Sequence, residues 1–226
     1  MNFFRAGCSY LDIQTRVARQ ARSLLGVMAL VMALATALAA SDAEAQDRQC
    51  QIANIASGTA VLMRAGVMLD TALGQTIQPG DRLVKSDAVQ VSITCSDGSE
   101  ITIGRAGEVD LGSLIAAPVQ ERRIFRLLRG IAGFVKPEQA EPVEVKTMNA
   151  VAAVRSTEWT VEVDGDATHV FVRKGVVQVT GESGEVTQLE VGQGVTVLAD
   201  DTLGPVTAWG RDRIEAMNAR LGGGWL

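Results

Sequence analysis

The stretch AVQVSITCSDGSEITI, residues 88–103, decides the fold class of this chain. Apolar residues occupy every second position from Val89 to Cys95, as a strand with one buried face requires. Ser96-Asp97-Gly98-Ser99 then turns the chain, and Ile101 and Ile103 resume the alternation. An Asp-Gly turn between two such runs is a strong hairpin signal, because glycine readily adopts a positive φ. The stretch therefore predicts a β-hairpin.

The same pattern of short alternating runs and glycine or aspartate turns continues on both sides of this hairpin. Five later runs show it: Glu158–Val163, Thr168–Arg173, Val176–Thr180, Val186–Glu190 and Val195–Leu198. Roughly ten short strands in about 140 residues leave little room for crossover helices, which excludes a parallel α/β sheet. The sequence predicts an all-β sandwich or solenoid.

Two segments interrupt the strand pattern. Residues 137–142 are polar with a proline at each end, and they predict an exposed loop. Beyond Gly204-Pro205, Ile214, Met217 and Leu221 fall at helical spacing. We therefore expect a short C-terminal helix and tail over residues 205–226, fraying at Gly222-Gly223-Gly224 and leaving Trp225 in an ordinary tail.

The N-terminal 45 residues have the three parts of a secretory signal. An uncharged apolar run of 17 residues, Leu24–Ala40, follows basic residues at 16, 19 and 22, and it ends before Ala43-Glu44-Ala45. This pattern predicts a signal peptide over residues 1–45, cleaved after Ala45. The alternative is a retained membrane anchor, because 17 apolar residues are at the lower limit for crossing a bilayer. Cleavage places the mature chain in the periplasm.

Cleavage would remove Cys8 and leave Cys50 and Cys95. An isolated cysteine pair in an oxidising compartment commonly forms a disulfide. The alternative is two unpaired buried thiols, which a retained N-terminus with cytosolic placement would favour.

Across the predicted strands, six short motifs occur in a fixed order. They are Gly80-Asp81, Asp97-Gly98-Ser99, the segment 129–134, Arg155-Ser156-Thr157 within 153–159, the hairpin 172–179 with Gly175 at its turn, and Val191-Gly192-Gln193. This succession over residues 57–198 resembles the periplasmic domain of the FecR family, although Ser156 stands where that family has glycine. The resemblance implies an all-β, solenoid-like twisted structure, which we expect to have two layers of many short strands and a short C-terminal helix. Only 23 residues precede the apolar run, so we expect the exported part of such a protein without its cytoplasmic anti-sigma region.

Composition and side-chain chemistry argue against several functions. The formal net charge of −5 disfavours a nucleic-acid partner. The single histidine, His169, lies in an alternating run without a nucleophile motif around it, so we expect no enzyme and no cofactor. One histidine and two cysteines are too few for a zinc site, and Asp164-Gly165-Asp166 is better explained as a hairpin turn than as a calcium site. Paired carboxylates acting on envelope sugars are the catalytic alternative, although no spacing selects such a pair.

Two features could contact a partner. Arg122, Arg123, Arg126 and Arg129 interleave with apolar residues and could meet an anionic lipid headgroup or cell-wall polymer. The alternative is a strand or short helix whose arginines face solvent. The strand pair formed by residues 159–163 and 168–173 could bind a protein by edge pairing.

These observations together predict a non-catalytic periplasmic binding or scaffold module that acts through protein or envelope-polymer contacts. The alternative is a membrane-anchored signalling component of a FecR-type transport-sensing system, which would contact the membrane only if the leader is retained. The oligomeric state stays open.

Overall fold

The structure is a computed structural model that describes residues 49–86, 90–116, 123–154, 157–200 and 202–225. The chain divides into two compact units, Met1–Asp47 and Arg48–Leu226, and the described residues belong to the second. The predicted signal peptide, with Ala43 and Ala45, lies outside the described residues. No helix in the described ranges is long and apolar enough to cross a membrane.

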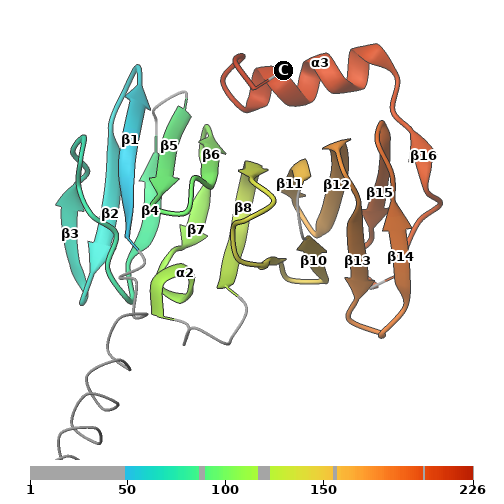
Figure 1. Cartoon of the computed structure of the whole chain (residues 1–226), viewed down its shortest axis with the longest axis horizontal. Coiled ribbons are helices and arrows are strands. Elements are labelled where there is room, and N and C mark those ends of the chain that lie inside the picture. The colour runs from blue at the N-terminus through green and yellow to red at the C-terminus, as the bar shows by residue number, and fades with distance from the viewer. Residues whose placement is uncertain (1–48, 87–89, 117–122, 155–156, 201, 226) are drawn as a thin grey trace, which may run out of the picture. The chain divides into compact units, whose positions relative to one another are not determined.

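The described unit is built from short strands in two hydrogen-bonded groups, sheet A and sheet B (Figure 1). Sheet A contains, in spatial order, β1 (Cys50–Ala56), β5 (Gln90–Cys95), β6 (Glu100–Gly104), β8 (Arg123–Lys136), β11 (Thr157–Asp164), β12 (Ala167–Lys174), β15 (Gln193–Val197) and β16 (Thr207–Ala208). Sheet B contains β3 (Val67–Asp70), β2 (Ala60–Arg64), β4 (Arg82–Ser86), β7 (Glu108–Asp110), β8 again, β9 (Val143–Lys146), β10 (Ala150–Val154), β13 (Val177–Gly181) and β14 (Val186–Leu189). The helices of the described residues are α2 (Gly112–Ala116) and α3 (Arg211–Arg220).

Strand β8 joins the two sheets. Its first half pairs with β7 and β9 in sheet B, and its second half pairs with β6 and β11 in sheet A. The halves meet at Gly130, where φ is +85° and an added Cβ would lie 2.9 Å from the Cα of Gly107. Only glycine fits this combination of positive φ and close backbone approach. The bend lets one strand serve both layers.

Later in the chain, successive hairpins alternate between the layers. The hairpin β11–β12 lies in sheet A, β13–β14 in sheet B, and β15–β16 in sheet A again. The buried valines of β12, β13 and β15 face the space between the two layers, as a two-layer core requires. This winding confirms the predicted all-β, solenoid-like architecture of many short strands with a short C-terminal helix.

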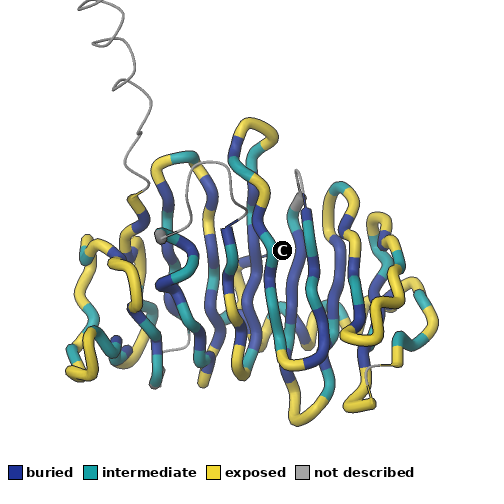
Figure 2. Tube along the Cα trace, turned by 90° about the horizontal axis from the view of Figure 1, so that it is seen from below, coloured by how far each residue is buried: buried dark blue, intermediate teal, exposed yellow. Residues whose placement is uncertain are grey.

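The stretch that decides the fold class forms the predicted hairpin in its described part. Val91 pairs with Ile103 and Ile93 with Ile101 across β5 and β6, and all four side chains are buried between the layers. Buried positions follow the strands, whereas exposed ones lie mostly in the turns (Figure 2). Cys95 at the end of β5 forms a disulfide with Cys50 in β1, which confirms the predicted pair.

The C-terminal segment covers part of the outer face of sheet A, where α3 packs beside β11 and β12. Met217 of α3 lies 3.1 Å from the hydroxyl of Thr160, and Trp225 lies against Gly133 of β8. Trp225 is 7% exposed, so it is a docked side chain, and the expectation of an ordinary fraying tail is wrong. The domain boundaries stay predictions; β1 precedes residue 57, the expected start of the β domain.

Candidate partner-binding groove

The family motif Gly80-Asp81 forms a buried structural anchor. The Asp81 carboxylate is fully buried and accepts two hydrogen bonds from the guanidinium of Arg64, at 2.8 and 2.7 Å. It also accepts a hydrogen bond from the backbone N–H of Gln78 at 2.8 Å. The hydrogen bonds from Arg64 to the Asp81 carboxylate raise the pKa of Arg64. A charge buried in this way is stable only because it is paired and hydrogen-bonded. Asp81 therefore fixes the β2–β3 hairpin rather than facing a ligand.

The second motif, Asp97-Gly98-Ser99, also serves the fold. Asp97 Oδ1 accepts the backbone N–H of Ser99 at 3.0 Å, while its Oδ2 lies 3.0 Å from Nη1 of Arg123. Arg123 also donates from Nε to Glu141 at 3.3 Å, and its side chain is 3% exposed. Arg123 thus belongs to an internal ion cluster that ties the start of β8 to two loops. With its side chain buried in this cluster, Arg123 neither faces solvent nor offers its guanidinium to the anionic partner for which the sequence made it a candidate.

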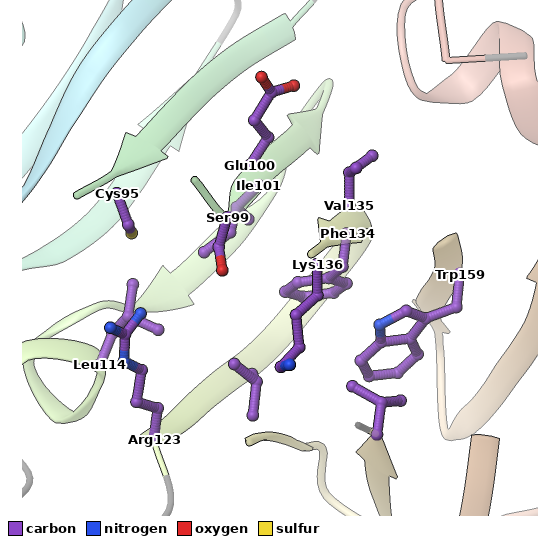
Figure 3. A pocket seen from close by; sticks show the side chains of 12 residues that line it. Cys95, Ser99, Glu100, Ile101, Leu114, Arg123, Phe134, Val135, Lys136 and Trp159 are labelled. Carbon is purple, nitrogen blue, oxygen red and sulfur yellow. The ribbon is translucent and has the colours of Figure 1, made fainter. Parts of the chain in front are cut away.

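A small internal cavity lies beside this cluster, with Lys136 between Arg123 and Trp159 (Figure 3). Lys136 donates to the carbonyl oxygen of Ala140 at 2.6 Å, and burial lowers its pKa. The free volume of about 10 Å³ is at the limit for a single water molecule. This cavity is therefore part of the core and is too small to bind a partner.

A larger open groove lies between α3 and the turns at one end of sheet A. Its volume is about 570 Å³. The lining side chains come from the β6–β7 turn, the bend of β8, the end of β11 and the end of α3, and the charged ones are Arg105, Arg129, Glu162, Asp164 and Arg220.

The cations of the groove differ in how they are paired. Arg220 is neutralised by Glu162 through two hydrogen bonds of 2.5 and 2.8 Å. Arg129 is 68% exposed and its only ion pair among the described residues is a loose one, 3.7 Å from Glu108. Arg105 is exposed, and the described part of the chain offers it no ion pair or hydrogen bond. Two guanidinium groups of this groove therefore stay available to an anionic group.

Backbone features shape the groove. Gly104 packs so closely that an added Cβ would lie 2.3 Å from the carbonyl oxygen of Arg220. Ala106 holds a positive φ of 58°, which turns the chain sharply after Arg105. The end of α3 can therefore approach the β6–β7 turn and form one wall.

The other residues singled out from the sequence are spread over the molecule. Arg126 is exposed on sheet B, and Gly175 has a φ of +84° in the turn between β12 and β13. Arg122, Arg155 and Ser156 lie outside the described residues, and Thr157 is described only by its backbone pairing with Lys136. The predicted arginine cluster is therefore divided: of its described members, Arg129 alone lines the groove.

The prediction that residues 159–163 and 168–173 bind a protein by edge pairing is wrong. Strand β11 lies between β8 and β12, and β12 lies between β11 and β15. Both strands are internal to sheet A, so neither offers free main-chain groups along an edge.

The single histidine and the Asp164-Gly165-Asp166 turn lie near the groove in the described part of the chain. His169 Nδ1 lies 2.9 Å from the hydroxyl of Thr196, and burial lowers the pKa of the imidazole. Gly165 adopts a φ of +59° in the β11–β12 turn, as expected for a hairpin. No group of three histidine, cysteine or acidic residues that could hold a metal ion occurs in the described ranges.

Sequence reasoning missed Arg105 and the contribution of α3. The available signal was the segment Gly104-Arg105-Ala106-Gly107, a lone cation between glycines, which marks a tight turn. Nothing in the linear pattern places the end of α3 beside that turn.

Comparison with known proteins agrees with the motif order. The family model described as FecR protein matches residues 81–178, which confirms the FecR resemblance for this segment. Two crystal structures of a putative anti-sigma factor from Parabacteroides distasonis ATCC 8503, at 2.50 and 1.65 Å resolution, are similar at 18% identity with a TM-score of 0.49. Each alignment covers 60% of this chain, and this chain spans 62% of the length of each solved chain. No curated protein matches the chain.

Proposed function

We propose that this chain is a non-catalytic periplasmic module of a FecR-type signalling system, and that it binds a protein or envelope-polymer partner in the groove between Arg105 and Arg129. The observation that carries the proposal is the pair of available guanidinium groups in an open groove of about 570 Å³. Both arginines lie within the segment that matches the FecR model.

The chemistry of the groove favours a partner with carboxylate or phosphate groups. Guanidinium groups present donors in a fork that matches such anions, and exposed cations also speed the encounter with an anionic surface. Ile131 and Val163 also line the groove, but they are only 2% and 6% exposed and offer a partner little apolar surface. A partner segment rich in acidic groups would use the two guanidinium groups.

An exported location is supported by the disulfide. Cys50 and Cys95 are 1% and 5% exposed, so the bond is held inside the core. Disulfides of this structural kind persist mainly in oxidising compartments. A regulatory role is supported by the FecR match, because that family acts in signalling.

The test of the groove is a double substitution, Arg105→Ala with Arg129→Ala, compared with Arg126→Ala. Arg126 is an exposed arginine away from the groove and serves as the matched control. Immobilised variants are incubated with solubilised envelope from the producing cells, and retained proteins and polymers are quantified. We expect the double variant to lose at least tenfold of the specifically retained material while the Arg126→Ala variant keeps it. Equal retention by all three forms, with unchanged unfolding transitions, would remove the groove as the binding site.

The second candidate is a membrane-anchored signalling component, favoured by the apolar run at residues 24–40. N-terminal sequencing of the protein from the producing cells separates the two. A first residue of Gln46 supports the periplasmic module. An uncleaved leader in the membrane fraction supports the anchored component.

A further inference from the structure

The two sheets differ in whether their N-terminal edge strands, β1 in sheet A and β3 in sheet B, are covered by other parts of the chain. Along β1, the segment Gly74–Ile77 supplies main-chain partners: the N–H of Ile52 donates to Gln75 at 3.0 Å, and the N–H of Ile77 donates to Cys50 at 2.8 Å. Gln51 and Thr76 form a bridge between these two contacts. The first edge of sheet A is therefore covered by the chain itself.

The first edge of sheet B has no such cover among the described residues. Strand β3 pairs with β2 alone. In this hairpin Thr71 donates its N–H to Ala60 at 2.9 Å, and hydrogen-bonded pairs alternate with non-bonded pairs along an antiparallel ladder. Val67 and Leu69 therefore bond toward β2, whereas the N–H and C=O groups of Met68 and Asp70 point to the open edge.

The side chains around this edge are apolar and exposed. Val67, Met68 and Leu73 are 58%, 62% and 67% exposed. Proteins usually protect an open edge with very short strands, charged side chains, proline or a bulge. Strand β3 is short and ends in Asp70, but it contains no proline, and its pairing with β2 has no bulge. Leu69 lies opposite the fully buried Leu62, so the apolar layer between the sheets reaches this end of the unit.

We propose that β3 is a dimerisation edge, at which a second copy of this chain adds its own β3 in antiparallel orientation. A two-fold axis through Leu69 would place Met68 opposite Asp70 of the second copy, and Asp70 opposite Met68 of the second copy. This register uses the outward N–H and C=O groups of both residues in each copy, giving four main-chain hydrogen bonds.

The same register explains why a second copy fits. Strand β3 is self-complementary in this arrangement, because the aspartates face methionines and not each other, so no like charges are directly opposed. Val67 and Leu69 of both copies lie on the core side and would close the apolar end of each unit. Terminal units of solenoids require such a cap. The resulting contact is isologous and closes as a dimer.

The first test is the mass of the purified chain in solution, measured by sedimentation over a range of concentrations. The wild type is expected to shift from one copy to two as concentration rises. Met68→Pro removes only an N–H that points to the open edge, where an edge strand tolerates proline. We expect this variant to dimerise with an affinity at least roughly tenfold lower than that of the wild type. Met68→Ala keeps the donor and should still dimerise. A wild type that stays monomeric at all concentrations would overturn the proposal.

The second test does not depend on tolerance of proline. Non-bonded antiparallel pairs have Cα atoms about 4.5 Å apart, which lies within disulfide range. Leu69→Cys is therefore expected to form a covalent dimer on mild oxidation, whereas Met148→Cys, at an exposed site between β9 and β10, should not. Absence of the Leu69→Cys cross-link, or equal cross-linking at both sites, contradicts the proposed register. The groove is not used in either test, so the outcome is independent of the proposed function.

Discussion

The outer face of sheet A and the outer face of sheet B both carry apolar side chains, yet the described residues cover only the face of sheet A. On sheet A, Ile131 and Phe171 lie beneath Trp209, Met217 and Trp225, and together they form an apolar cluster separate from the main core. On sheet B, Leu128 and Val186 remain 44% and 52% exposed. Apolarity alone therefore does not decide which face is covered.

The difference lies in the glycines. At Gly194 of β15 an added Cβ would lie 2.3 Å from Nε1 of Trp209, and at Gly133 of β8 it would lie 2.7 Å from Nε1 of Trp225. These positions let indole rings rest directly on the strand backbone. The outward positions of sheet B carry side chains such as Ile124, Val151 and Gln178 instead. The C-terminal segment therefore docks where glycines leave the strand backbone uncovered, and not where the sheet face is more apolar.

The largest effect is expected from removing one docked ring. Trp225→Ala takes away a side chain that is 7% exposed and stacks near Arg173, whose guanidinium lies 5.3 Å from the ring centre. Loss of a buried tryptophan lowers the free energy of unfolding by about 3 kcal/mol. Val186→Ala on the open face should change it by less than about 0.5 kcal/mol. Denaturant unfolding of both variants measures the contrast, and equal losses would show that the covering is not stabilising.

A smaller loss of stability is expected when a side chain is added at the glycine on which Trp209 rests. Gly194→Val would push Trp209 away from β15 and should cost about 2 kcal/mol through overpacking, outweighing the gain from a better strand former. Gln178→Val adds the same side chain to the outward face of β13, where it should be nearly neutral. Thermal unfolding and protease digestion of the C-terminal segment report the difference. If Gly194→Val is as stable as the control, Trp209 does not need the glycine.

Much of the fold could be predicted because alternation is local. Val91, Ile93, Ile101 and Ile103 carry a period of two that any half-buried strand shows, and Asp97-Gly98 marks the turn between them. The docking of Trp225 could not be predicted, because its partner Gly133 is far away in sequence and is unremarkable within its own strand. A glycine within a strand can be recognised as a docking position only once the segment that packs on it is known.

The candidate site was harder to predict for the same reason. Arginines 123, 126 and 129 are close in sequence, but the structure places them in three different environments. Arg123 lies in a buried ion pair, Arg126 on the exposed face of sheet B, and Arg129 in the groove beside the bend at Gly130. Charge spacing along a strand predicts alternate faces, and it does not reveal that Asp97 and Glu141 pair with Arg123. Arg105 reaches the groove only through tertiary contacts between the β6–β7 turn and α3.

The smallest expected effect concerns pH and is confined to the covered face. His169 is half-buried on sheet A, and burial lowers its pKa. Glu162 and Asp164 from β11 raise that pKa, whereas Arg213 and Arg220 from α3 lower it further. The folded state therefore favours neutral histidine, while the unfolded chain takes up a proton near pH 6.5. Stability is fully present above pH 6.5 and falls as the pH drops below it, by at most about 1.4 kcal/mol per pH unit.

His169→Gln tests this prediction because glutamine can keep a hydrogen bond to Thr196 without titrating. Unfolding midpoints of the wild type and the variant are compared from pH 7.5 to pH 5, where carboxylates contribute equally to both. The wild type should lose more stability than the variant over this interval. Because Arg213 and Arg220 lie on α3, the excess loss should appear first as faster digestion of the C-terminal segment, while strands of the open face stay protected. Parallel pH profiles would mean that the imidazole has the same pKa in the folded and unfolded states, and the covered face would then have no acid sensitivity of its own.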